Sequence, residues 1–212
     1  MRRHFLGFIA AALMLGAGAA SGQALDQLLK AADSGDAKTV AGLLDKGLDP
    51  NSADKQGMTV LMIASVQGHT ELVKVLLDHK ADVRRRSPAG DTALLLASLK
   101  GHLGVVKLLV EHGAPVSQPG WAPLHYAAFE GRAEVVRYLL EKGADKDALA
   151  PNGYPPLLLA LRGGHMDAAR ELLYADADVQ IKGQRGETAL GLAKKANDEK
   201  LVELIKRAGA VE

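Results

Sequence analysis

The histidines are the side chains of this chain with most scope for chemistry, and their spacing is regular. His69, His102 and His165 each follow a glycine, while His79 and His112 lie one 33-residue interval apart. Catalysis or metal binding would need such rings to converge with carboxylates or thiolates. The chain has no cysteine, no nucleophile motif, no phosphate-binding glycine loop and no isolated carboxylate pair. We therefore expect no catalytic residue, no metal site and no cofactor; an enzyme would require an unexpected polar pocket.

The composition favours a protein built from thin layers rather than around one large core. Of 212 residues, 48% are hydrophobic but only 4% are aromatic, and repeated thin layers can be filled by Leu, Ala and Val. Without its first 24 residues the chain carries 24 basic and 25 acidic side chains. This near-neutral balance argues against nucleic acid as a partner, because binding phosphates requires a basic face.

The first 24 residues are typical of a signal peptide. A short basic start with Arg2 and Arg3 precedes an uncharged run over residues 5–20, and small residues follow, which suit cleavage after Gly22 or Ala24. The run is too short for a good membrane span. The alternatives are a buried N-terminal helix or an uncleaved anchor. We expect a periplasmic protein with no stable membrane span after cleavage.

The N-terminal sequence is compatible with two export pathways. Arg2 and Arg3, followed by Phe5 and Leu6 after one residue, resemble the core of a twin-arginine signal. The basic region is unusually short, so ordinary Sec export is favoured. Twin-arginine export would carry the protein across the membrane already folded.

Residues 54–193 show four columns of identical residues in register, with a period of 30 or 33 residues. The first contains Gly57, Gly90, Gly120, Gly153 and Gly186, and the second Leu61, Leu94, Leu124, Leu157 and Leu190. The third contains Ala64, Ala97, Ala127, Ala160 and Ala193, and the fourth Gly68, Gly101, Gly131 and Gly164. Such self-similarity indicates a stack of repeats, each a single supersecondary unit.

Each unit predicts a turn, a short helix, a tight turn, a longer helix and a loop. In the third unit Gly90 permits the turn and Thr92 caps a helix that begins at Ala93. Gly101 ends that helix, and a helical apolar stripe follows. Gly113 then ends the second helix in the left-handed conformation.

The chain resembles the ankyrin-repeat family over about residues 27–210. The resemblance rests on residues 57–61 (GMTVL), 90–94 (GDTAL), 122–128 (APLHYAA), 186–190 (GETAL), 68–77 (GHTELVKVLL) and 101–109 (GHLGVVKLL). It implies an all-α solenoid of helix-turn-helix units with short β-hairpin fingers, in about six repeats including caps. After a signal peptide at 1–24, the domain covers 25–212, with repeats at about 25–53, 54–86, 87–116, 117–149, 150–182 and 183–212.

The resemblance also assigns roles to the histidines and to the two ends. The rings after the inter-helix glycines, and His125 at its helix start, are expected to form hydrogen bonds with neighbouring backbone. Repeat one lacks the finger turn and is expected to cap the N-terminus. In repeat six Asn197 replaces the glycine among several lysines, which suits a solenoid end that faces water.

Partner binding in this family implies finger tips and the exposed ends of the first helices. Three aromatic residues fall at these positions: Trp121, Phe129 and Tyr154. Tyr126 and Tyr138 instead fall in core columns. Exposed aromatic side chains commonly anchor an interface. The positions Met58, Val66, Leu99 and Arg162 extend the predicted surface; the alternative for Trp121 is that it fills a gap left by the shortened turn after Gly113.

A second candidate contact is the basic finger Arg84, Arg85 and Arg86, near Lys55. It would steer an acidic partner surface, or it is simply solvated. We predict a protein-binding module, monomeric on its own, that docks an exported enzyme and supports its folding, stability or activity. The alternative is an inhibitor or immunity-type protein that blocks a secreted toxin or hydrolase.

Overall fold

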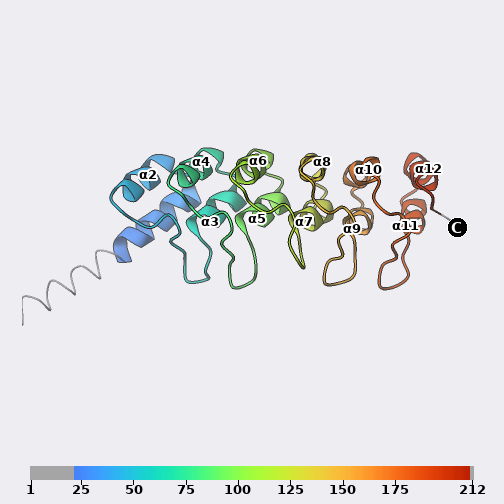
Figure 1. Cartoon of the computed structure of the whole chain (residues 1–212), viewed down its shortest axis with the longest axis horizontal. Helices are drawn as coiled ribbons and strands as arrows, with labels where there is room; N and C mark the ends of the chain where they lie inside the picture. The colour runs from blue at the N-terminus through green and yellow to red at the C-terminus, as the bar shows by residue number, and fades with distance from the viewer. Residues whose placement is uncertain (1–21, 211–212) are drawn as a thin grey trace, which may run out of the picture.

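The computed structural model describes residues 22–210, which form six helix pairs stacked side by side in an elongated solenoid (Figure 1). The pairs are helical residues 22–34 with α2 (Ala37–Asp45), α3 (Val60–Gln67) with α4 (Thr70–Asp78), α5 (Ala93–Lys100) with α6 (Leu103–Glu111), α7 (Pro123–Phe129) with α8 (Ala133–Glu141), α9 (Pro156–Gly163) with α10 (Met166–Tyr174), and α11 (Ala189–Lys195) with α12 (Glu199–Arg207). Residues 1–21, most of the predicted signal peptide, lie outside the described residues. The all-helical solenoid is confirmed.

Loops that we call fingers precede each pair from α3 onward and project from the helix layers (Figure 1). Four fingers close with a backbone hydrogen bond across the turn, for example from Ser87 N–H to Asp91 O at 2.9 Å and from Ala150 N–H to Tyr154 O at 3.1 Å. Within residues 22–210 only Ala53 and Thr59 form a β-bridge. The expected β-hairpins are therefore tight turns rather than strands, because the legs pair too briefly to build a ladder.

Helix ends follow the predicted capping residues. The Thr92 hydroxyl accepts the Leu95 N–H at 3.2 Å, and α5 begins at Ala93 as expected. Gly101 ends α5 with a φ of 81°, and Gly113 follows α6 with a φ of 85°. In repeat six Asn197 takes this role with a φ of 53°, a conformation that asparagine tolerates better than most residues.

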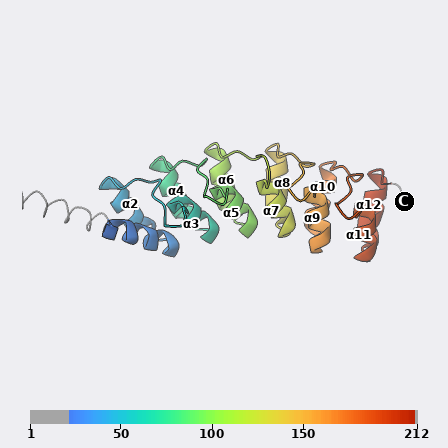
Figure 2. The ribbon, with the colours of Figure 1, turned by 90° about the horizontal axis from the view of Figure 1, so that it is seen from below.

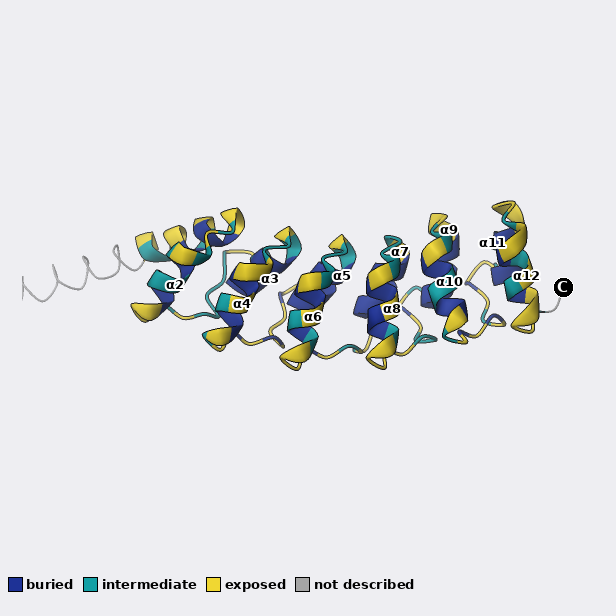
Figure 3. Ribbon diagram, turned by 90° about the horizontal axis from the view of Figure 1, so that it is seen from above, coloured by how far each residue is buried: buried dark blue, intermediate teal, exposed yellow. Residues whose placement is uncertain are grey.

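The core is one continuous layer between the two rows of helices. Dark buried faces point between the helices, and exposed residues gather at the helix ends and on the outer row (Figure 3). The pairs lie alongside one another down the whole length of the stack (Figure 2). Leu94, Leu124 and Leu157, from one sequence column, are each at most 1% exposed. The apolar columns are therefore structural.

Side chains after the inter-helix glycines tie each repeat to the one before it. The His69 ring lies 2.9 Å from Asp33 O, and the His102 ring lies 3.1 Å from Val66 O, which confirms the expected bonds to backbone. Arg132 takes the same position in repeat four and donates from Nε to Leu99 O at 3.1 Å. The His165 ring packs against Gly131 so closely that a Cβ there would lie 2.4 Å from Nδ1.

The fingers form a second set of ties, which is interrupted once. Backbone N–H groups donate to side-chain oxygens of the preceding finger, from Asp82 to Asn51, Asp145 to Ser117 and Asp178 to Asp147, at 2.8, 3.2 and 2.8 Å. Between repeats three and four the donor position holds Pro115, which has no N–H. Arg84 stands at the matching acceptor position, so its side chain is not needed to join the repeats.

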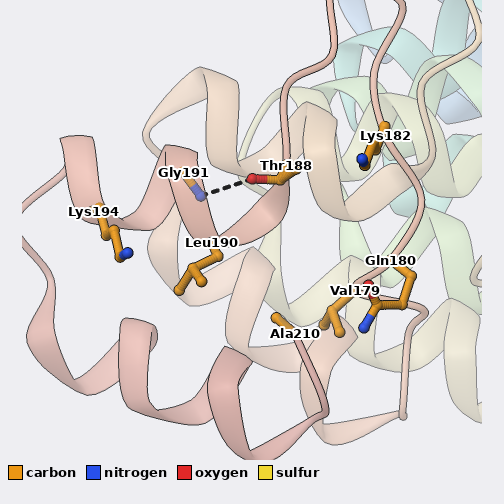
Figure 4. Close-up of a pocket in the computed structure, with 8 residues that line it drawn as sticks. All are labelled: Val179, Gln180, Lys182, Thr188, Leu190, Gly191, Lys194 and Ala210. Atoms are coloured by element: carbon orange, nitrogen blue, oxygen red, sulfur yellow. Dashed lines mark hydrogen bonds between the residues drawn. The ribbon is translucent and has the colours of Figure 1, made fainter. Parts of the chain in front are cut away.

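A cavity of about 290 Å³ lies in the last described repeat, beside α11 (Figure 4). Gly191 lines it, with its N–H bound to the Thr188 hydroxyl at 3.1 Å. The preceding repeat has a fully buried Leu158 at the Gly191 position and a buried Leu161 at the position of Lys194. Small and charged residues thus replace the two leucines, and this end faces water.

Candidate protein-binding surface

Trp121 lies half-buried on the finger of repeat four. Its ring packs at a tilt against Tyr126, with centroids 5.2 Å apart, and edge-on against His125 at 5.9 Å. The shortened turn is braced by Gln118, whose Nε2 donates to Trp121 O at 2.6 Å. Trp121 therefore covers the start of its own helix and still keeps part of its ring in solvent.

His125 is the buried support beneath Trp121. Its Nδ1 accepts the Ala122 N–H at 3.0 Å, so Nε2 carries the proton and donates to Ala148 O at 2.8 Å. This is the backbone role expected from the sequence. Burial lowers the pKa of His125 against the opposing effect of these hydrogen bonds, so the neutral ring is favoured. His125 fixes the finger of repeat four to both α7 and the next finger.

Phe129 and Tyr126 continue the aromatic surface along α7. Phe129 is 50% exposed, and its position three residues after Tyr126 places both side chains on one helix face. Tyr126, which was expected in a core column, does pack against the core but is only partly buried, so part of its side chain remains at the surface. Burial first, and the charge of Asp91 second, raise the Tyr126 pKa. We call Trp121, Tyr126 and Phe129 the repeat-four aromatic face.

Tyr154 does not present its ring to solvent as expected from its position, because it is 4% exposed. The next finger closes over it: a Cβ on Gly183 would lie 2.5 Å from the ring, so only glycine leaves enough room. The Tyr154 hydroxyl donates to Glu187 Oε2 at 2.8 Å. This correction follows from the neighbouring finger, which the position of Tyr154 within its own repeat does not reveal.

Arg162 completes a cluster with Tyr154 and Glu187. Its guanidinium carbon lies 4.6 Å from the centroid of the Tyr154 ring, and its Nε lies 3.8 Å from Glu187 Oε1. The hydrogen bond from Tyr154 is the main cause that lowers the Glu187 pKa. We call these three residues the closed triad. Arg162 is exposed, but its charge is already paired within the molecule.

The remaining predicted apolar contacts offer little free surface. Met58, Val66 and Leu99 are each partly exposed, and both Met58 and Val66 pack against the core. The Leu99 carbonyl accepts a hydrogen bond from Arg132. These three side chains therefore add no further large exposed group to the predicted surface.

The three arginines of the basic finger are exposed but not equivalent. Arg86 donates to Gln118 Oε1 at 3.0 Å and lies 3.5 Å from Gly90 O, so it braces the shortened finger. The side chains of Arg84 and Arg85 form no hydrogen bond or ion pair within residues 22–210. The interrupted ladder at Pro115 explains why the position of Arg84 can carry a long charged side chain. Arg84 and Arg85 are thus free to meet a partner.

Two exposed residues were missed by the sequence reasoning. Leu149 is 56% exposed on the finger of repeat five, and Tyr174 is 68% exposed at the end of α10. Comparison along the repeats could have found both. The position of Leu149 holds Arg86 and Lys182 in other repeats, and the last residue of α4, α6 and α8 is acidic. Tyr174 lies on the outer row, in a groove with Arg137 and Glu171.

Within 22–210, no group of three or more His, Asp or Glu side chains is arranged to hold a metal ion. No helix in this part of the chain combines the length and apolar character required to cross a bilayer.

Comparison with known proteins places this surface in context. The family "Ankyrin repeats (3 copies)" matches residues 28–118 and 80–150, and "Ankyrin repeat" matches residues 152–184. A putative ankyrin repeat-containing protein of Treponema pallidum is 37% identical over 92 residues, which cover 43% of this chain and 31% of that protein. The human ankyrin repeat and KH domain-containing protein 1 is 39% identical over 90 residues, or 41% and 4% of the two chains. The matches thus span less than a third of these relatives.

The fold comparison agrees with the sequence matches. The crystal structure of the human ASB11 ankyrin repeat domain superposes with a TM-score of 0.79 and 27% identity, and covers 87% of this chain and 84% of that chain. Ankyrin repeats generally mediate contacts between proteins, which accords with the exposed aromatic side chain of Phe129. Together, the repeats, their joints and the matched family show that this chain belongs to the ankyrin-repeat family.

Proposed function

We propose that this protein is a periplasmic docking module that binds an exported partner protein through the repeat-four aromatic face and thereby supports the partner's folding, stability or activity. The observation that carries the proposal is Phe129, which is 50% exposed and follows Tyr126 by three residues on α7, where the Tyr126 ring packs against Trp121. Large aromatic side chains that remain in contact with water favour burial against another protein. The protein itself performs no chemistry in this account.

The surrounding charges suit a reversible protein contact. Arg84 and Arg85 extend from the finger of repeat three, while Glu130 and Arg132 pair with each other at 3.6 Å beside Phe129. A polar rim around an apolar centre is typical of interfaces between proteins that also exist separately. The face thus combines an anchor with groups that orient a partner.

Export is supported by the N-terminal sequence. Arg2 and Arg3 precede an apolar run and small residues near Ala24, and the chain has no cysteine that could form unwanted disulfides in an oxidising compartment. A fusion of residues 1–24 to a reporter enzyme should deliver it to the periplasm. Retention in the cytoplasm would contradict the export part of the proposal.

The binding part is tested by capture of partners from periplasmic extract. The protein is compared with the double variant Trp121→Ala and Phe129→Ala, and with Tyr174→Ala as a control for an exposed aromatic residue on the outer row. We expect the double variant to lose a protein that both the unchanged chain and the control retain. Equal capture by all three would contradict the proposal. Thermal unfolding of each variant checks that the fold survives.

The effect on the captured partner separates support from inhibition. If the partner is an enzyme, its activity and unfolding temperature are measured with and without the module. A rise in either agrees with a supporting role. A loss of activity on binding would contradict that role and indicate an inhibitor.

A further inference from the structure

The closed triad shows how this fold holds a cation. In repeats five and six, an aromatic ring and a carboxylate stand on neighbouring finger tips, at Tyr154 and Glu187. Arg162 at the end of α9 places its guanidinium 4.6 Å from the ring centroid and 3.8 Å from the carboxylate. A cation that lies over an aromatic ring and beside a carboxylate is stabilised twice, by the negative face of the ring and by the negative charge of the carboxylate.

The same positions in repeats three and four provide the ring and the carboxylate but not the cation. Trp121 stands at the position of Tyr154, and Phe129 stands at the position of Arg162. Asp91 occupies the tip of the neighbouring finger, before Trp121 rather than after it. The face therefore has more aromatic surface than the closed triad and lacks its internal positive charge.

The Asp91 carboxylate is only partly engaged. Its Oδ2 accepts the Ser87 hydroxyl at 3.3 Å, and no Lys or Arg pairs with it within residues 22–210. The charge of Asp91 acts on Tyr126, where it is the second cause of the raised pKa after burial. Arg86 contacts both Gly90, the residue before Asp91, and Gln118, which donates to Trp121 O. These contacts place Asp91 beside the finger of Trp121, where its carboxylate can share a ligand with the aromatic face.

No lysine or arginine among residues 22–210 lies over the rings of this site. Within the described residues, rings with a lysine or arginine above them are those of Tyr138 and Tyr154, and none belongs to the aromatic face. On the basic finger, the Arg86 guanidinium is held by Gln118 and Gly90. Arg132 pairs with Glu130.

We infer that the repeat-four aromatic face and Asp91 together bind a cationic side chain, an arginine or lysine, that the partner protein inserts. The inference rests on the proposed function and specifies the chemistry of its central contact. The partner's cation would lie over the rings and pair with Asp91, as Arg162 does with Tyr154 and Glu187. The closed triad is then a filled site built from the same kinds of group, with its carboxylate on the following finger instead of the preceding one.

The test uses Trp121 as a built-in reporter, because it is the single tryptophan of the chain. Its fluorescence is followed in the full-length protein during titration with the peptide acetyl-Gly-Gly-Arg-Gly-Gly-amide. The comparison peptide carries citrulline, a neutral residue of nearly the same shape, in place of arginine. We expect saturable binding in the millimolar range, about threefold to tenfold weaker for the citrulline peptide.

Variants identify the groups responsible. Asp91→Asn keeps the shape of the turn and should weaken arginine binding about threefold to tenfold, while Phe129→Leu keeps an apolar side chain and should also weaken it. Asp78→Asn, at an exposed acid on the outer row, is the matched control and should leave binding unchanged. Circular dichroism confirms that each variant is folded.

Three results would overturn the inference. They are equal affinity for the two peptides, unchanged binding by Asp91→Asn, and the absence of a saturable signal up to about 50 mM peptide. A Trp121 response to a glutamate peptide in place of arginine would do the same. These failures are distinct from failure of the proposed function. If partner capture still depends on Trp121 and Phe129 but not on Asp91, the docking proposal stands and the cation inference falls.

Discussion

Repeats four and five each carry an aromatic residue at the same finger-tip position, but the residue in repeat four is partly exposed and the one in repeat five is buried. Trp121 keeps part of its ring in solvent over His125, whereas Tyr154 is 4% exposed beneath the next finger. The difference lies in the following repeat, because Gly183 leaves a space that Tyr154 fills. The position corresponding to Gly183 in the finger after Trp121 is Ala150. Exposure in a solenoid is therefore decided jointly by neighbouring repeats.

The largest expected effect comes from removing the support of repeat four. His125→Ala leaves the Ala122 N–H and the Ala148 carbonyl without their buried partner and creates a cavity. We expect a loss of about 2–4 kcal/mol in the free energy of unfolding, measured by urea denaturation. His112→Ala, at an exposed helix end, is the control and should cost less than about 1 kcal/mol. Similar losses for both variants would show that His125 has no special role.

The second prediction concerns the buried site of Tyr154 beneath the finger of repeat six. Gly183→Ala places a Cβ 2.5 Å from the Tyr154 ring, so the ring must leave its site. We expect a loss of about 1–3 kcal/mol in the free energy of unfolding, measured by urea denaturation. We also expect greater exposure of Tyr154, measured by the titration of its hydroxyl. Combining it with Tyr154→Ala should remove most of the added cost. A fully additive pair would contradict this explanation.

The pH dependence separates His125 from an exposed histidine. Because burial lowers the His125 pKa in the folded state, the unfolded chain binds its proton first as the pH falls below 6.5. The stability contribution is present above that value and is lost as the pH falls toward the folded pKa. His79 has the opposite sign, because a hydrogen bond to the Val75 carbonyl and then Asp45 raise its pKa.

Urea midpoints at about pH 7.5 and about pH 5.5 test this difference. The unchanged protein should be less stable at the lower pH. His125→Gln, which does not titrate there, should reduce that difference. An unaltered pH dependence in this variant would assign the effect to other groups.

The smallest expected effect on stability comes from a substitution in the repeat-four aromatic face. Phe129→Ala removes a side chain that is 50% exposed, so we expect a loss of less than about 1 kcal/mol by thermal unfolding. Leu124→Ala in the same helix should cost about 2–5 kcal/mol, because Leu124 is 1% exposed. A large loss for Phe129→Ala would mean that the residue serves the core.

The sequence predicted the repeated fold well because its signals are local. Thr92 and Gly113 act on the backbone of their own repeat, and their capping roles could be stated before the structure was known. The exposure of aromatic residues was predicted less well. Tyr126 was expected in the core and is only partly buried against it. Tyr154 was expected at the surface, which is wrong, because the next finger closes over its ring. That no Lys or Arg within residues 22–210 pairs with the Asp91 carboxylate likewise depends on contacts between repeats.

The affinity of the captured partner for two single variants tests the central claim most directly. Phe129→Ala and Tyr174→Ala each remove an exposed aromatic side chain, one from the repeat-four aromatic face and one from the outer row. The account predicts that Phe129→Ala weakens binding about tenfold or more, while Tyr174→Ala leaves the Kd unchanged. An unchanged Kd for Phe129→Ala, or a loss confined to Tyr174→Ala, would contradict it and place the binding surface elsewhere.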